Sequence, residues 1–178
     1  MLFTGTYSWG ILMGQIFNAV VDFLTDDGWK YTILEEDQEL LALTLSFKGR
    51  NGSWQCFAIV DEEKHWLRFY SILPVHVHED KREDATEFMT RANYGLMLGN
   101  FEMDWNDGEV RFKTSVDAEG GELTKPMIDN LLRSNLISMD RYFPGLMAVL
   151  YSDRLPSQIY EEVATEVSED RPSFDDEA

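Results

Sequence analysis

The chain has 178 residues, 44% of them hydrophobic and 13% aromatic, which is the composition of a folded domain rather than of a disordered chain. Its formal net charge of −18 argues against nucleic acid and anionic membranes as partners, because both repel an acidic surface. No base precedes Lys30 and polar residues soon interrupt the apolar N-terminal stretch. We therefore expect no signal peptide and no membrane span, and we expect a cytoplasmic protein.

Apolar residues at helical spacing predict a first helix over residues 8–26, and Gly28 is suited to ending it. Alternating apolar and polar residues then predict four strands in succession, near residues 29–33, 41–47, 53–61 and 65–73. The Asn51-Gly52 pair predicts a hairpin between the second and third of them, since both residues tolerate positive φ. Four strands joined by short turns make an antiparallel meander.

A second helix is predicted from a helical stripe that ends before Gly99: Ala85, Phe88, Met89, Ala92 and Leu96. A hairpin follows, in which Asp107-Gly108 fits a two-residue turn. In that register Trp105 lies opposite Val110 and Asp104 lies opposite Arg111. Met103 then lies opposite Phe112 and Glu102 opposite Lys113, so that each pair joins apolar to apolar or acid to base.

A last helix is predicted to begin near Pro126, with an apolar stripe that Asn135 interrupts and with a kink or restart at Pro144. Residues 161–178 hold eight acids and one base, which is typical of a mobile segment. We therefore expect one domain over residues 1–155 and a flexible acidic tail over residues 156–178. The predicted fold class is α+β, with about six antiparallel strands in the order α-ββββ-α-ββ-α and helices on one face or at the ends of the sheet.

His76, His78 and Glu79 form the segment that most resembles a metal site, because imidazole and carboxylate groups are ligands for zinc or iron. The alternative is a solvated connector between a strand and a helix. That alternative is favoured, because no third ligand stands at a recognisable spacing and an H-x-H pair alone is common. We expect no cofactor and no catalytic set.

Two other chemical readings are weaker. Cys56 lies among apolar residues of the third strand, which favours a buried thiol over a nucleophile. Gly95 and Gly99 match the spacing of neither the Walker A loop nor the dinucleotide-binding loop. A helix precedes the strand here, so no helix N-terminus faces a ligand.

Arg91 is expected to pair with Glu87 on the surface of the second helix, with the carboxylate of a partner protein as the alternative.

The block NYGLMLGNFEMDWNDGEVRF, residues 93–112, resembles the YbjN-like domains of bacteria, in which a helix with a late Asn leads into a similar hairpin. Gly28 with Trp29 and the spacing of Asp140 and Pro144 are also similar. The resemblance covers about residues 8–151. The length and acidic C-terminal segment are similar to the cyanobacterial branch.

This resemblance implies the fold of type III secretion chaperones, which are small, acidic, usually dimeric proteins that hold extended segments of client proteins. One departure is that four strands, rather than three, are expected before the second helix. The resemblance brings no catalytic residues, so we expect a non-enzymatic, chaperone- or adaptor-like homodimer with a protein client. Its candidate contact residues are Phe88, Met89, Arg91, Tyr94, Trp105 and Phe112. The rival hypotheses are a sensory regulator that binds a small ligand and an enzyme centred on the His76 segment.

Overall fold

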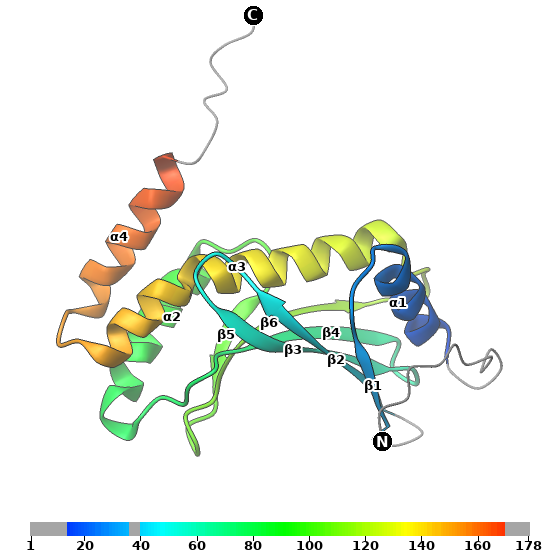
Figure 1. The fold of residues 1–178 in the computed structure, drawn as a ribbon, viewed down its shortest axis with the longest axis horizontal. Helices are drawn as coiled ribbons and strands as arrows, with labels where there is room; N and C mark the ends of the chain where they lie inside the picture. Colours follow the sequence, from blue (N-terminus) through cyan, green and yellow to red (C-terminus); the bar gives the residue numbers. More distant parts are fainter. Residues whose placement is uncertain (1–13, 36–39, 170–178) are drawn as a thin grey trace, which may run out of the picture.

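The computed structural model describes residues 14–35 and 40–169. They form an α+β fold, in which six antiparallel strands lie in the order β1-β2-β3-β4-β6-β5 and four α-helices accompany them (Figure 1). The strands are β1 (Thr32–Glu35), β2 (Leu40–Lys48), β3 (Ser53–Asp61), β4 (Trp66–Ile72), β5 (Asn100–Met103) and β6 (Val110–Asp117). The predicted meander of four strands before the second helix is confirmed.

The helices are α1 (Gln15–Asp26), α2 (Arg82–Tyr94), α3 (Lys125–Tyr151) and α4 (Pro156–Glu169), with a short 3₁₀ helix over Glu79–Lys81. Figure 1 shows α1 and α3 on the same side of the sheet, and α3 packs on β4 and β6. The core lies between these helices and the sheet. Alternate residues of β3 and β4, such as Cys56, Ala58, Leu67 and Phe69, are buried on the face of the sheet that the helices cover. We call it the inner face.

The first helix is shorter in the described residues than predicted, because α1 begins at Gln15 and residues 8–13 lie outside the described part. The carboxylate of Glu62, in the β3–β4 turn, accepts the backbone N–H groups of Ile16 and Phe17 at 3.3 and 2.6 Å. A distant side chain therefore caps the start of α1.

The hairpin at Asn51-Gly52 is confirmed, but neither residue has positive φ. Strand pairing ends at Lys48 opposite Ser53, so the turn contains four residues rather than two. The carboxylate of Asp140 in α3 accepts the N–H groups of Arg50 and Asn51 at 3.2 and 2.9 Å. Contacts from α3, rather than a tight-turn geometry, hold this hairpin.

The predicted register of the second hairpin is wrong by two residues. Met103 lies opposite Val110, Glu102 opposite Arg111 and Phe101 opposite Phe112. Asp104 does not pair with Arg111, because its side chain accepts the N–H of Asn106 at 2.8 Å and starts a longer turn over residues 104–109. Gly108 completes that turn with a φ of 81°. The shift is an even number of residues, so every side chain keeps its predicted face.

Two differences from the predictions lie in the C-terminal third. Of the kink or restart predicted at Pro144, the restart is wrong, because helix α3 is continuous through that residue. Residues 156–169 are not a flexible tail, because they form α4, which packs against α2 and α3 and buries Ile159 and Val163. The apolar surface offered by α2 and α3 gives this acidic helix a place to bury its few apolar side chains. Residues 170–178 lie outside the described residues.

Candidate protein-binding site

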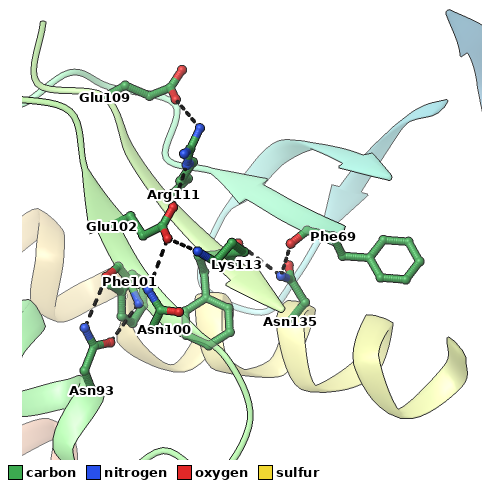
Figure 2. A network of polar contacts seen from close by, with 10 residues as sticks. Phe69, Asn93, Asn100, Phe101, Glu102, Glu109, Arg111, Lys113 and Asn135 are labelled. Carbon is green, nitrogen blue, oxygen red and sulfur yellow. Dashed lines mark hydrogen bonds and ion pairs between the residues drawn. The ribbon is translucent and has the colours of Figure 1, made fainter. Parts of the chain in front are cut away.

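Helix α2 lies along the edge of the sheet formed by β5, and Asn93 joins the two. The Asn93 side chain accepts the N–H of Phe101 at 2.7 Å and donates to its carbonyl at 3.1 Å (Figure 2). Two bonds to one residue reproduce the pairing that a neighbouring strand would make. Asn93 therefore closes this sheet edge against strand addition at Phe101.

The other end of α2 is also fixed to the hairpin. Arg82, in the first turn of α2, donates from Nη1 to the carbonyl of Trp105 at 2.9 Å. Gly99, between α2 and β5, has a φ of 81°, and a Cβ there would lie 2.5 Å from the carbonyl oxygen of Lys113. This close approach and left-handed conformation require glycine. The backbone of the α2–β5 connection is therefore held in place by Asn93 before its exposed residues and by Gly99 after them.

The residues between these fixed points carry exposed apolar side chains. Tyr94 and Met97 are each 95% exposed and Leu98 is 43% exposed. We call these three residues the loop patch. No residue from Asn93 to Phe101 is charged, in a chain whose net charge is −18. An uncharged, exposed apolar patch on such a surface is typical of a contact site.

A second feature lies at the tip of the β5–β6 hairpin, where a hollow of about 450 Å³ is lined by Glu102, Met103, Asp104, Trp105, Glu109 and Arg111. Trp105 is 55% exposed. The carbonyl of Trp105 contacts the first residue of α2 and Tyr94 is the last residue of that helix. Because 13 residues of helix span about 18 Å, the two exposed aromatic side chains belong to separate surfaces.

An acid–base cluster lies on the face of the sheet opposite α3 and shares Glu102, Glu109 and Arg111 with the hollow. Glu102 accepts from Arg111 Nε at 3.0 Å and from Lys113 Nζ, and Arg111 also lies 3.9 Å from Glu109 (Figure 2). Partial burial raises the pKa of Glu102, but the hydrogen bonds from Lys113 and Arg111 outweigh burial and hold the pKa below its ordinary value. The Arg111 guanidinium also lies 4.7 Å from the centre of the Tyr70 ring.

Three of the six predicted contact residues are core side chains. Phe88, Met89 and Phe112 are buried in the hydrophobic core, where the ring of Phe88 packs against Tyr142 and the ring of Phe112 against Phe101. This corrects their place in the predicted contact set. Arg91 pairs with Glu87 at 2.8 Å on the exposed side of α2, as expected for i,i+4 neighbours. Tyr94 and Trp105 remain exposed.

The side chains of the candidate metal segment, which the sequence favoured as a solvated connector, do not converge on one point. His76 Nδ1 lies 3.1 Å from the carbonyl of Asp107, whereas His78 Nδ1 lies 2.6 Å from the carboxylate of Asp80. Glu79 lies near Arg82 instead, at 4.0 Å. Within residues 14–35 and 40–169, no group of three His, Cys, Asp or Glu side chains is placed to hold a metal ion. The two imidazoles thus have separate partners.

A buried polar junction joins α3 to the inner face, and the sequence alone gave Asn135 no role beyond interrupting a stripe. Asn135 donates to the carbonyls of Phe69 and Phe112 at 3.1 and 3.0 Å, and accepts from Ser71 at 2.6 Å. Ser71 in turn accepts from the Trp54 indole at 2.9 Å. A polar residue at a core position of an apolar helix is the signal that predicts such a junction.

Cys56 lies beside this junction, 3.4 Å from the Ser71 hydroxyl. Its burial raises the pKa of the thiol to about 11, which keeps it protonated at neutral pH. A protonated, buried thiol is a poor nucleophile, which agrees with the expected core role.

Among the helices of the described residues, none has the length and apolar character needed to cross a membrane.

Comparison with protein-family models places these features in a known family. Residues 17–147 match the model of the YbjN family, whose description reads "Putative bacterial sensory transduction regulator". The chain belongs to the YbjN family. The match covers both α2 and the β5–β6 hairpin, which carried the resemblance in the sequence. Comparison with curated protein sequences gives no match.

Three solved structures are similar to this chain in fold. YbjN from E. coli is 12% identical with a TM-score of 0.49, over 88% of this chain and 96% of that chain. A chain of the HopA1-SchA chaperone-effector complex is 15% identical with a TM-score of 0.47, over 69% and 88%. A chain of the ExsC-ExsE complex is 17% identical with a TM-score of 0.47, over 73% and 94%. At these levels the likeness describes the fold alone.

Proposed function

We propose that this YbjN-family chain is a non-enzymatic protein-binding module, adaptor- or chaperone-like, that forms a homodimer through the loop patch and binds a client elsewhere on its surface. The observation that carries the proposal is the near-complete exposure of Tyr94 and Met97 on an uncharged segment. Burying large apolar side chains stabilises an association by roughly 1.5–3 kcal/mol each.

Charge supports a second copy as the partner at this patch. Two copies with a net charge of −18 repel one another wherever their acidic surfaces meet. An uncharged patch is where that repulsion is weakest, and in a two-fold dimer the same patch faces itself. Arg91 lies about one helical turn before Tyr94 and, with its partner Glu87 a turn further back, supplies a polar rim.

The hairpin hollow is assigned to the client, because Trp105 is at the opposite end of α2 from the loop patch. An exposed tryptophan beside Met103 offers an anchoring surface for an apolar side chain. Catalysis is not part of the proposal, since the Cys56 thiol stays protonated and the two histidines of the candidate metal segment have separate partners. A family description of sensory transduction is compatible with a role that operates through binding.

Light scattering coupled to size-exclusion chromatography tests the proposal. At about 50 μM, within a range that reveals weak dimers, we expect the mass of a dimer. The double variant Tyr94→Ser/Met97→Ser is expected to elute as a monomer with an unchanged circular dichroism spectrum. Trp105→Ser is the matched control, because it removes an exposed aromatic side chain outside the patch and should leave the dimer intact. A monomeric wild-type chain at this concentration would contradict the dimer.

A further inference from the structure

The turn between β2 and β3 is bound to α3 through Asp140. The carboxylate of Asp140 accepts the backbone N–H groups of Arg50 and Asn51 at 3.2 and 2.9 Å. The backbone carbonyl of Asp140 accepts a third hydrogen bond, at 2.9 Å, from Nδ2 of the Asn51 side chain. We call these three hydrogen bonds the Asp140 clasp. Asn51 is exposed, so water reaches the side chain that the clasp holds.

Asn51 is the one asparagine of the chain that a glycine follows. The side-chain carbonyl of an asparagine can be attacked by the backbone nitrogen of the next residue, and a side chain on that residue hinders the approach. Gly52 has no side chain to do so. Its N–H donates to no group within residues 14–35 and 40–169, so the nitrogen is available. The other six asparagines precede Ala, Tyr, Phe, Asp or Leu.

We propose that Asn51 is a site of spontaneous deamidation and that the Asp140 clasp sets the rate of this reaction. The Gly52 nitrogen forms a bond to the side-chain carbonyl carbon of Asn51 and gives up its proton to water. Nδ2 leaves as ammonia, and a succinimide ring remains. Water then opens the ring at either of its carbonyls, so the product is aspartate or isoaspartate. Water is consumed and ammonia is released, and the reaction needs no oxidant.

The clasp opposes the geometry that ring closure requires. The Asn51 side chain has to turn toward the Gly52 nitrogen, which breaks the hydrogen bond from Nδ2 to the Asp140 carbonyl. The two hydrogen bonds to the Asp140 carboxylate also restrict the backbone just before the reacting residue. A free peptide of residues 48–54 has neither restriction. The folded chain should therefore deamidate more slowly than this peptide.

The products cannot re-form the clasp. Aspartate presents an oxygen where Nδ2 donated, so two acceptors face each other at the Asp140 carbonyl, and the carboxylates of residues 51 and 140 repel one another. Isoaspartate lengthens the backbone by a methylene group in a tightly packed turn. A Cβ on Gly52 would lie 2.7 Å from the Phe143 ring, and one on Gly49 would lie 2.1 Å from the Asp140 carboxylate. Deamidation thus loosens this hairpin from α3 irreversibly.

Peptide mapping by mass spectrometry tests the site in the full chain. After incubation in mildly alkaline buffer, we expect a gain of about 1 Da at Asn51 and none at Asn106, which is exposed in a turn but precedes Asp107. The free peptide of residues 48–54, incubated in parallel, should react faster. An Asn51 that stays intact long after the peptide is fully converted would overturn the site. Equal rates in the chain and the peptide would overturn control by the clasp.

Asp140→Ala tests the clasp itself. We expect deamidation at Asn51 to become about fivefold faster than in the wild type, with Asn106 still intact and the circular dichroism spectrum unchanged. Asp129→Ala, which removes a carboxylate from the same helix, is the matched control and should react at the wild-type rate. An unchanged rate at Asn51 in Asp140→Ala, or an equal acceleration at Asn106, would overturn the role of the clasp.

Asn51→Asp supplies the aspartate product from the start. Hydrogen exchange at the Arg50 amide should become about fivefold faster than in the wild type, because its partner is no longer held in place. Asn106→Asp adds the same charge to another exposed turn and should leave that rate unchanged. A wild-type exchange rate at Arg50 in Asn51→Asp would overturn the loosening. The modification does not depend on the loop patch, so Tyr94→Ser/Met97→Ser should deamidate at the wild-type rate.

Discussion

The sheet has two polar networks, one on each face, and the two are built from different chemistry. Figure 2 labels Asn135 of the first network and Glu102, Arg111 and Lys113 of the second. On the inner face, Asn135, Ser71 and Trp54 form a junction of neutral groups. On the opposite face, which we call the outer face, Glu102, Arg111 and Lys113 form a cluster of charged groups. The inner network lies in the core, where an unpaired charge is costly, and the outer one keeps contact with water.

The difference predicts unequal contributions to stability. A hydrogen bond in the core is costly to lose, because the remaining partner cannot turn to water. A partly exposed ion pair contributes less, since water and salt screen it. The number of polar contacts in each network is therefore a poor guide to the free energy that each supplies.

Asn135→Leu should have the largest effect. Leucine has the same branched shape, although a larger volume, and it leaves the Ser71 hydroxyl and the carbonyls of Phe69 and Phe112 without their partner, which should lower the free energy of unfolding by about 2–3 kcal/mol. Urea denaturation measures it. Asn130→Leu, on an exposed position of the same helix, is the control and should change stability by less than about 0.5 kcal/mol. Equal losses of unfolding free energy in Asn135→Leu and Asn130→Leu would contradict the large contribution expected of the buried network.

Asn93→Ala should have an intermediate effect, because Asn93 is half-buried and makes two hydrogen bonds to one residue. We expect a loss of about 1–2 kcal/mol and faster hydrogen exchange at the Phe101 amide, which loses its 2.7 Å partner. Exchange measured by NMR should change little at Lys113, on the neighbouring strand. Thr90→Ala, exposed on the same helix, should leave both amides as they are. An unchanged Phe101 rate in Asn93→Ala would show that α2 alone protects this edge.

Glu102→Gln should have the smallest effect at neutral pH, about 0.5–1 kcal/mol, and the effect should shrink in high salt. The pKa of Glu102 lies below its ordinary value of 4.5 in the folded chain. Its stabilisation is therefore complete above that value and is lost as the pH falls through the folded-state pKa. Denaturation at pH 7 and pH 3 should show the variant and wild type converging in acid. Glu109→Gln, which removes only the 3.9 Å contact, should differ less at pH 7.

Periodicity predicted the strands and their faces, but it could not predict details that depend on distant residues. The β5–β6 register was missed because the Asp104 side chain, rather than the Asp107-Gly108 pair alone, sets the length of the turn. Since the error was two residues, the acid–base face and the apolar face were still correct. A turn's length depends on local hydrogen bonds that an alternating pattern does not encode.

The candidate site was predicted in part, for a related reason. Spacing marks Phe88 and Phe112 as apolar, yet only the packing of α3 and α4 shows that they are core rather than contact residues. Helix α4 was missed because its acidic composition is that of a mobile tail, and its burial depends on a surface made by α2 and α3. Tyr94 stays exposed because the chain turns away from α2 just after it.

The Glu62 cap on α1 has a consequence for how the polypeptide is made. The capping carboxylate is 46 residues beyond the amide it binds at Ile16, so it leaves the ribosome well after the helix residues have done so. During synthesis at about 5–20 residues per second, the helix waits several seconds for its cap. A 12-residue helix is marginal alone, so α1 should become stable only once the β3–β4 hairpin has formed. Helix α1, the first helix of the described residues, is therefore expected to be one of the later elements to fold.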